Sequence, residues 1–268
     1  ILSTQGDSYA GNCTNQTGIN GNISTDPLFV DGGAGDYRLQ ASSPLIDAGN
    51  NSAPMLPLTD FERTNRIKDG NRDGLLVVDI GAFESPFHFT TFLRGSGSNG
   101  NPSVLFLDGA PSNSTAKFKD SAGIGFSGGN AWQPVGSWSA DSASVSGSLE
   151  TLSDLHLWLG LKNNDDIGTR FDVAAEVWKN NEYIATGQVF CVTNVVRNQS
   201  LAKEVVISFS PFTSTNFDGG SDVLTLKVFT RIGTDGSGNL CAGHSNAQGL
   251  RVYFDSTDRN ARFSGGLD

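Results

Sequence analysis

Alternation of apolar and polar residues is the feature that most restricts how this chain can fold. From residue 155 to residue 161 every second residue is a leucine, and His156 and Trp158 stand between the leucines. A period of two is typical of a β-strand with one buried face. The pattern returns in residues 171–177 and 183–189, after turn-rich segments. We therefore predict three consecutive strands that form an antiparallel meander.

The composition favours many short strands joined by tight turns. The chain of 268 residues has 33 glycines and a single methionine, and glycine, asparagine and aspartate accept the backbone angles that turns need. Further runs with strand character bring the expected number of strands to roughly nine. These runs are residues 87–93, 104–107, 135–139, 205–209, 223–229 and 250–254. A two-sheet antiparallel β-sandwich, jelly-roll-like, is the fold that such a series predicts.

The chain is expected to contain two domains, residues 1–86 and residues 87–268. In the first, short apolar groups alternate with glycine, asparagine and aspartate, and the sustained alternation begins only after Pro86. The first segment buries too little by itself to be a stable core. We expect it to pack on upstream residues, on the second domain or on another subunit.

Charge and hydropathy narrow the range of partners. The formal net charge is −10 and the pI is about 4.7, whereas binding to a phosphate backbone relies on clustered lysine and arginine. We therefore expect no nucleic-acid partner. No apolar run approaches the ~18 residues that a membrane helix requires, so no membrane insertion is expected.

Three blocks of the first segment resemble a known kind of terminus. They are Ser24-Thr-Asp-Pro-Leu-Phe-Val-Asp31, residues 35–49, and Val78-Asp-Ile-Gly-Ala-Phe-Glu84. In this order they are similar to the C-terminal end of secreted bacterial right-handed parallel β-helix proteins, of the pectate-lyase-like or choice-of-anchor type. Residues 125–132 and 249–263 are similar to the β-sandwich module appended to such proteins. The resemblance implies terminal β-helix rungs followed by a sandwich, at an extracellular or cell-surface location.

One loop of the first segment has the spacing of a calcium site. Asp69-Gly-Asn-Arg-Asp-Gly74 places oxygen ligands at positions 1, 3 and 5 and glycine at position 6, as in the start of an EF-hand loop. The expected donors are Asp69, Asn71, Asp73, the Leu75 carbonyl and Asp79. The twelfth position is Ile80, which departs from the pattern. A plain turn between two strands is the alternative interpretation.

A weaker candidate site lies on the predicted meander. His156, Trp158, Asp172, Glu176 and Trp178 are expected on the outward face of neighbouring strands. Aromatic rings together with carboxylates can hold a sugar, so a cell-surface polysaccharide is a possible partner. The alternative is a contact with the second sheet, or a cross-strand pair that only stabilises the meander.

The three cysteines are Cys13, Cys191 and Cys241. No Cys-x-x-Cys spacing of a zinc or redox site occurs. A disulfide between Cys191 and Cys241 would suit an exported protein and would close a long loop, and unpaired thiols are the alternative. Cys13 would then be a small buried or free thiol.

No residue is predicted to be catalytic, because the usual catalytic motifs do not occur in the sequence. The first hypothesis is a non-enzymatic extracellular structural or adhesive protein that caps, anchors or self-assembles as an oligomer or filament. The alternatives are a carbohydrate-binding module and a fragment of a β-helix enzyme that degrades polysaccharides. The expected partners are a second copy of this chain or upstream β-helix rungs.

Overall fold

The chain forms two compact units, Ile1–His88 with Asp268, and Phe89–Leu267, here called the first and second unit. The computed structural model describes residue 17 and residues 22–268, except residues 41, 72, 74, 98, 99, 113, 114, 143 and 236. Cys13 lies outside the described residues. The described part is almost entirely β-structure, with two short 3-10 helices, η1 (Asn164–Asp166) and η2 (Gln199–Leu201). The expected all-β class is confirmed at this level.

The first unit contains little regular structure. Strands β1 (Phe29–Asp31) and β2 (Asp36–Leu39) form an antiparallel hairpin. Gly35 in the intervening turn has a φ of 87°, which glycine adopts without steric cost. The remaining described residues form turns, tied by isolated antiparallel bridges such as those between Thr59 and Asn65 and between Lys68 and Val77.

The expectation of parallel β-helix rungs is therefore wrong. Rungs would stack as parallel strands, but every pairing in the described residues of the first unit is antiparallel. The physical reason lies in the side chains at its centre. Asp60, Asp79 and Glu84 are buried there and accept backbone N–H groups, so hydrogen bonds between turns replace a ladder between rungs.

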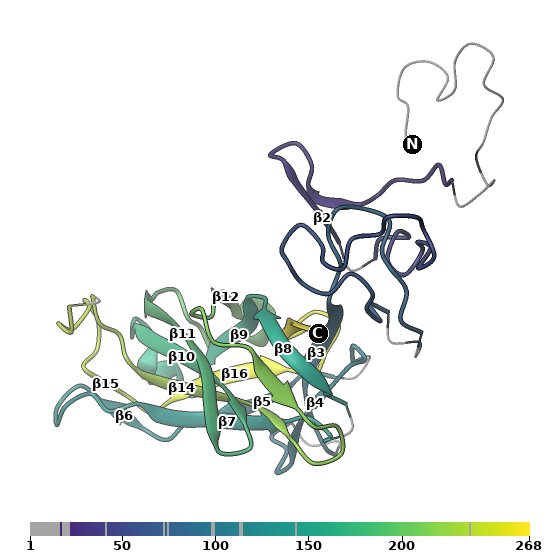
Figure 1. The fold of residues 1–268 in the computed structure, drawn as a ribbon. Coiled ribbons are helices and arrows are strands. Elements are labelled where there is room, and N and C mark those ends of the chain that lie inside the picture. Colours follow the sequence, from purple (N-terminus) through teal and green to yellow (C-terminus); the bar gives the residue numbers. More distant parts are fainter. Residues whose placement is uncertain are drawn as a thin grey trace. The chain divides into compact units, whose positions relative to one another are not determined.

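The second unit is built from most of the strands (Figure 1). The longer ones are β3 (Phe87–Gly95), β7 (Gln133–Ser139), β8 (Gly147–Leu152), β9 (Leu155–Leu161), β10 (Phe171–Lys179), β11 (Glu182–Val192), β14 (Leu224–Ile232) and β17 (Arg262–Leu267). The shorter ones are β4 (Leu105–Asp108), β5 (Lys117–Asp120), β6 (Ile124–Gly125), β12 (Lys203–Ile207), β13 (Thr215–Phe217), β15 (Asn246–Ala247) and β16 (Leu250–Phe254).

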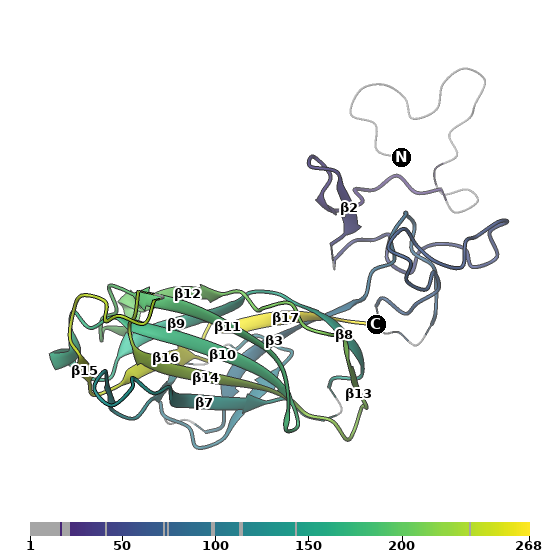
Figure 2. The same ribbon diagram turned by 60° about the vertical axis from the view of Figure 1, so that its left-hand side comes forward.

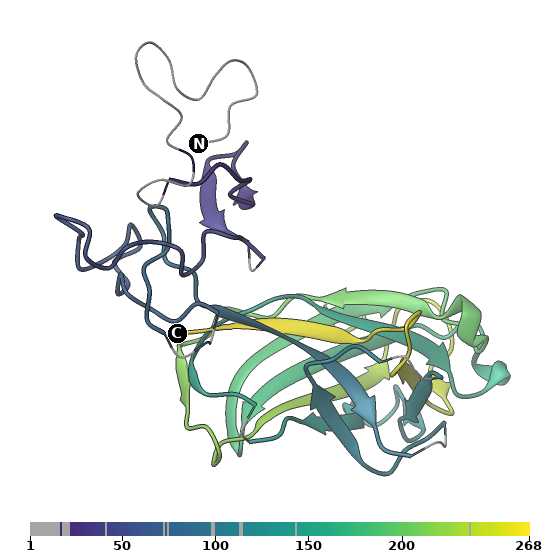
Figure 3. The same ribbon diagram turned by 90° about the vertical axis from the view of Figure 1, so that its right-hand side faces the viewer.

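One hydrogen-bonded path connects the main sheet in the order β11-β10-β14-β7-β4-β3-β17-β9-β16-β5. Strand β12 is added at β9, and β8 carries β13 and pairs with β17. Figure 2 shows β11, β10, β14 and β7 running side by side. In Figure 3 the C-terminal strand β17, drawn in yellow, extends along the second unit. Strand β10 pairs antiparallel with β11 and β14, whereas β4 and β7 pair in parallel, so the sheet is mixed.

The sheet curves so that strands far apart in this order face each other across the interior. Trp138 on β7 is fully buried, and its ring meets that of Phe254 on β16 edge to face, with centroids 5.3 Å apart. At another point Gly187 on β11 lies directly against Ile207 and Ser208, and a Cβ there would collide with the Ser208 carbonyl. The second unit therefore has one apolar core between two layers of strands.

The apolar runs read from the sequence are strands, with ends that differ by a few residues. The leucines of β9 are fully buried while His156 and Trp158 are partly exposed, as the alternation predicts. The predicted meander, however, is wrong. Strands β10 and β11 pair with each other, but β9 pairs with β12, β16 and β17. Alternation identifies the buried face of a strand, and it carries no information about the neighbouring strand.

Candidate ligand-binding site

In the described residues of the predicted calcium loop, side-chain oxygens accept hydrogen bonds from the loop's own backbone amides. The amide of Asp73 donates to Asp69 Oδ1 at 3.1 Å and to Asn71 Oδ1 at 2.8 Å. The amide of Leu75 donates to Asp73 Oδ1 at 2.8 Å. Aspartate and asparagine side chains commonly bond backbone groups two residues onward in this way. The side-chain oxygens that were expected to bind calcium therefore accept N–H groups.

Asp79, the fifth expected ligand, is turned into the first unit. It is 3% exposed, and its two carboxylate oxygens accept the amides of Asp47 and Ser85. Asp47 in turn accepts the amides of Gly70 and Asn71. Backbone N–H groups of the loop therefore point at a carboxylate. Among the residues that the structure describes, no three His, Cys, Asp or Glu side chains are grouped to hold a metal. The described side chains of the loop bond the backbone as the turn interpretation expects, and the calcium site stays a prediction.

Glu84 is a second deeply buried acid of this network. Its side chain is 1% exposed, Oε1 lies 3.2 Å from Arg66 Nη1, and Oε2 accepts the Asp79 amide at 2.9 Å. Burial raises the pKa of Glu84 to about 7, and the nearby carboxylates of Asp79 and Asp60 add to this rise. The Asp79 amide and Arg66 oppose it without cancelling it. Burial of an acid favours its neutral form because a low-dielectric surrounding penalises the charge.

This shift predicts a pH-dependent stability of the first unit. Between the ordinary value near 4.5 and about 7, the folded unit holds a proton on Glu84 that the unfolded chain releases. The stabilisation is therefore fully present below pH 4.5 and lost as the pH rises through 7. We expect this loss to be about 3 kcal/mol. The protection of the Asp79 and Ser85 amides, expressed relative to the intrinsic exchange rate at each pH, should fall over this range.

Glu84→Gln should remove this pH dependence, because the amide stays neutral at every pH. The matched control is Glu62→Gln, since Glu62 is exposed in the same unit and should keep the wild-type profile. An unchanged profile in Glu84→Gln would show that another group titrates.

The predicted aromatic and acidic patch is not formed, since β9 and β10 are not neighbours. On β9, His156 Nδ1 lies 3.0 Å from Glu204 Oε1, and the Trp158 ring is covered by the guanidinium of Arg259, 4.9 Å from its centroid. These two residues therefore contact partners on β12 and beyond β16, and they are separated from Glu176 and Trp178.

Glu176 and Trp178 form a packed cluster of their own on β10. Trp178 Nε1 donates to Glu176 Oε2 at 2.9 Å, and Lys227 Nζ lies 3.7 Å from the centroid of the Trp178 ring. Tyr183 on β11 meets the same ring edge to face. The polar atom and one ring face of Trp178 are thus already in use. The alternative interpretation, a cross-strand aromatic contact, describes this cluster.

The remaining cysteines are joined, and a buried acid lies beside them. Cys191 on β11 and Cys241 form a disulfide that spans 50 residues of sequence, with Cα atoms 6.1 Å apart. Asp172 on β10 is completely buried and accepts the amides of Cys191 and Thr234, both at 2.9 Å. It also accepts the Thr234 hydroxyl at 2.7 Å and pairs with Arg231 Nε at 2.9 Å. Every nearby donor is matched, so this centre is structural.

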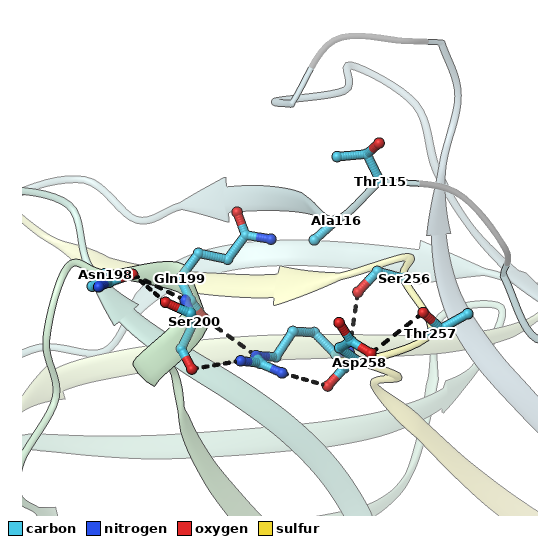
Figure 4. Close-up of a pocket in the computed structure, with 9 residues that line it drawn as sticks. Thr115, Ala116, Asn198, Gln199, Ser200, Ser256, Thr257 and Asp258 are labelled. Carbon is cyan, nitrogen blue, oxygen red and sulfur yellow. Dashed lines mark hydrogen bonds between the residues drawn. The ribbon is translucent and has the colours of Figure 1, made fainter.

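The best-defined hollow of the second unit is a polar pocket of about 440 Å³ (Figure 4). Three segments line it: residues 115–116 before β5, residues 198–200 at η2, and residues 256–259 after β16. Figure 4 shows the amide of Gln199 directed across the hollow toward Ala116. The volume falls within the range usual for small-molecule sites.

The walls of this pocket are held by hydrogen bonds within the protein. Each of the three guanidinium nitrogens of Arg259 donates to a carbonyl: Nε to Gln199 at 3.2 Å, and the other two to Ser200 and Asp258 at 2.8 Å. The Arg259 amide donates to Ser256 Oγ at 3.0 Å. Arg259 therefore ties two of the three lining segments together, and its positive charge faces protein oxygens.

The groups presented to the pocket are hydroxyls, an amide and one acid. Thr257 and Asp258 are exposed, and so are Gln199 and Ser200. Arg259 is the cation of the lining, and each of its three nitrogens is bound to a carbonyl; none of the lining residues is aromatic. Sequence reasoning missed the pocket because its three segments lie in turns far apart in the chain. The only local signal is the dense series of polar residues at 256–260.

Partner predictions stay open at this stage. The first unit exposes large apolar side chains, including Met55 at 97% and Leu58 at 91%, and the expectation of a homo-oligomer stays a prediction. Among the described residues, no helix has the length and apolar character that crossing a bilayer needs.

Comparisons with known proteins give no family. No family model matches the chain, and no curated protein matches it. A CocE/NonD family hydrolase from Staphylococcus aureus is similar in structure with a TM-score of 0.42 and 16% identity, over 68% of this chain and 37% of that one. An aminopeptidase from the marine sediment archaeon Thaumarchaeota archaeon has a TM-score of 0.44 and 8% identity, over 73% and 39% of the two chains. Infectious bursal disease virus, Gt strain, has a TM-score of 0.30 and 10% identity, over 74% and 41%.

The chain thus spans about two fifths of the length of these structures. The resemblance to β-helix proteins is wrong, because the described residues of the first unit pair only in antiparallel fashion and form no parallel rungs. The expectation of a non-enzymatic structural or adhesive protein depended on that resemblance and is wrong with it. The same finding removes the alternative of a β-helix enzyme fragment, and the separation of β9 from β10 removes the basis for a carbohydrate-binding module on their shared face.

Proposed function

We propose that the second unit recognises a small, uncharged, hydroxyl-rich ligand, such as a free sugar or a polyol, in the pocket between residues 115–116, 198–200 and 256–259. The observation that carries the proposal is the combination of a pre-formed polar hollow with an arginine that directs one N–H donor of each of its three nitrogens to a protein carbonyl. An anionic ligand would have to share the guanidinium of Arg259 with these carbonyls. Hydroxyl groups can instead donate to Asp258 and accept from the Gln199 amide.

The fold and the compartment fit this proposal. We interpret the two layers of the second unit as an antiparallel β-sandwich of jelly-roll type, a fold in which loops at the strand ends commonly carry binding sites. The disulfide between Cys191 and Cys241 supports an oxidising, extracytoplasmic location, in line with the expected extracellular or cell-surface protein.

The test is a binding experiment with a panel of neutral monosaccharides, disaccharides and linear polyols. Saturation-transfer NMR and calorimetry measure the binding. At least one compound should bind wild-type protein, and Asp258→Asn should weaken it about tenfold, because a hydrogen bond to a charged acceptor is lost. Gln188→Ala is the matched control, since Gln188 is exposed on β11 and does not line the pocket. It should bind like wild type.

Two outcomes would contradict the proposal. One is the absence of binding across the whole panel. The other is tighter binding of a sugar phosphate than of the corresponding free sugar, which would show that the site takes an anion.

A further inference from the structure

A single buried carboxylate lies behind the pocket. Asp255 directly precedes the lining segment 256–259, and its side chain is completely buried. Oδ1 pairs with Arg94 Nε at 2.7 Å, and Oδ2 pairs with Lys117 Nζ at 2.5 Å. Lys117 directly follows the lining segment 115–116. The ion pair between Asp255 and Lys117 therefore connects the residues that directly adjoin two of the lining segments.

The backbone at this position is restrained as well. Asp255 has a φ of 61°, in the left-handed region that non-glycine residues adopt rarely. Its carbonyl accepts the hydroxyl of Ser112 at 3.2 Å, and its carboxylate accepts the Gly95 amide at 3.3 Å. These contacts hold a sharp change of direction at the end of β16, and this change sends residues 256–259 over the pocket.

The third wall is reached through Arg259, which donates to the carbonyls of Gln199 and Ser200. A continuous series of contacts thus runs from Lys117 through Asp255 and along residues 256–259 to η2. Burial opposes ionisation of Asp255, but hydrogen bonds from Lys117 and Ser112 and the charge of Arg94 outweigh it and hold its pKa below the usual range. The carboxylate is therefore ionised at physiological pH.

We infer that Asp255 is the positioning residue of the pocket, which sets the separation of its walls and so the affinity for the ligand. The part of this inference that concerns ligand affinity rests on the proposed function. The positioning of the walls can be measured in the absence of a ligand. The competing explanation is that Asp255 contributes only to the general stability of the second unit.

Asp172 provides a matched control for that competing explanation. It is also a completely buried carboxylate, paired with one arginine and accepting two backbone amides, but it lies beside the disulfide and does not line the pocket. Asp255→Asn and Asp172→Asn should therefore have comparable effects on global stability. Only the first should change the pocket.

The experiment is hydrogen exchange of the full chain, measured under conditions in which both variants remain folded by tryptophan fluorescence. Asp255→Asn should speed exchange of the Arg259 and Ser200 amides about tenfold or more, with little change at Thr234. Asp172→Asn should show the reverse. Equal acceleration of the Arg259 amide in both variants, or no acceleration in Asp255→Asn, would overturn the inference.

If Asp255→Asn fails to fold, Lys117→Met replaces it, because it removes the link to residues 115–116 and keeps the acid paired with Arg94. The same selective acceleration is expected, and its absence would overturn the inference. Binding of the sugar or polyol found for the wild type should weaken about tenfold in the chosen variant. If the wild type binds none of these compounds, the proposed function fails while the exchange result still decides the role of Asp255.

Discussion

Replacing both Cys191 and Cys241 with alanine is expected to lower the free energy of unfolding of the second unit by about 4 kcal/mol. The bond closes a loop of 50 residues, so its loss restores a large conformational freedom to the unfolded chain. The bond also links β11 to the segment after β14 that carries Thr234, whose amide donates to Asp172.

Chemical denaturation followed by tryptophan fluorescence measures this effect, because all four tryptophans lie in the second unit. Adding a reductant should shift the midpoint of the wild type to that of the double variant and should leave the variant unchanged. If the wild type and the double variant unfold at the same denaturant concentration, the disulfide does not contribute to stability.

Asp172→Ala is expected to cost about 3 to 5 kcal/mol, because it removes one partner of a buried ion pair. Three hydrogen-bond donors lose their acceptor at the same time: the amides of Cys191 and Thr234 and the hydroxyl of Thr234. Unsatisfied buried donors are costly because they have given up water without a replacement. The variant should still fold, but with a clearly smaller free energy of unfolding than the wild type.

The same fluorescence measurement tests this expectation. Glu182→Ala is the control, since Glu182 is exposed on the neighbouring strand β11 and should leave the unfolding midpoint close to that of the wild type. A loss below about 1 kcal/mol in Asp172→Ala would mean that water enters the site and replaces the carboxylate.

Much of the secondary structure could be predicted from the sequence, for a physical reason visible in β9. Its four leucines are completely buried, whereas His156 and Trp158 between them are partly exposed. The amphipathic pattern therefore determines which face of the strand is buried. Short strands with mixed burial, such as β5 and β13, gave no such signal and were missed. Both are held by pairing with β16 and β8, which is a tertiary effect.

The candidate sites were less predictable. The loop at residues 69–75 has the residue types and spacing of a cation site, yet the same oxygens satisfy their own backbone amides. Aspartate and asparagine serve both purposes equally well, so spacing cannot separate them. The patch that included Trp158 and Trp178 required β9 and β10 to be neighbours, and strand order is set by packing over long sequence distances.

The sequence by itself determined the all-β class and the buried face of β9, because side-chain alternation acts locally along the backbone. Only the tertiary structure decided the partners of those strands, the antiparallel turns of the first unit and the pocket behind which Asp255 lies. Those features join residues such as Lys117 and Asp255, which are 138 positions apart. Contacts over that distance depend on how the whole apolar core closes, and no local pattern records them.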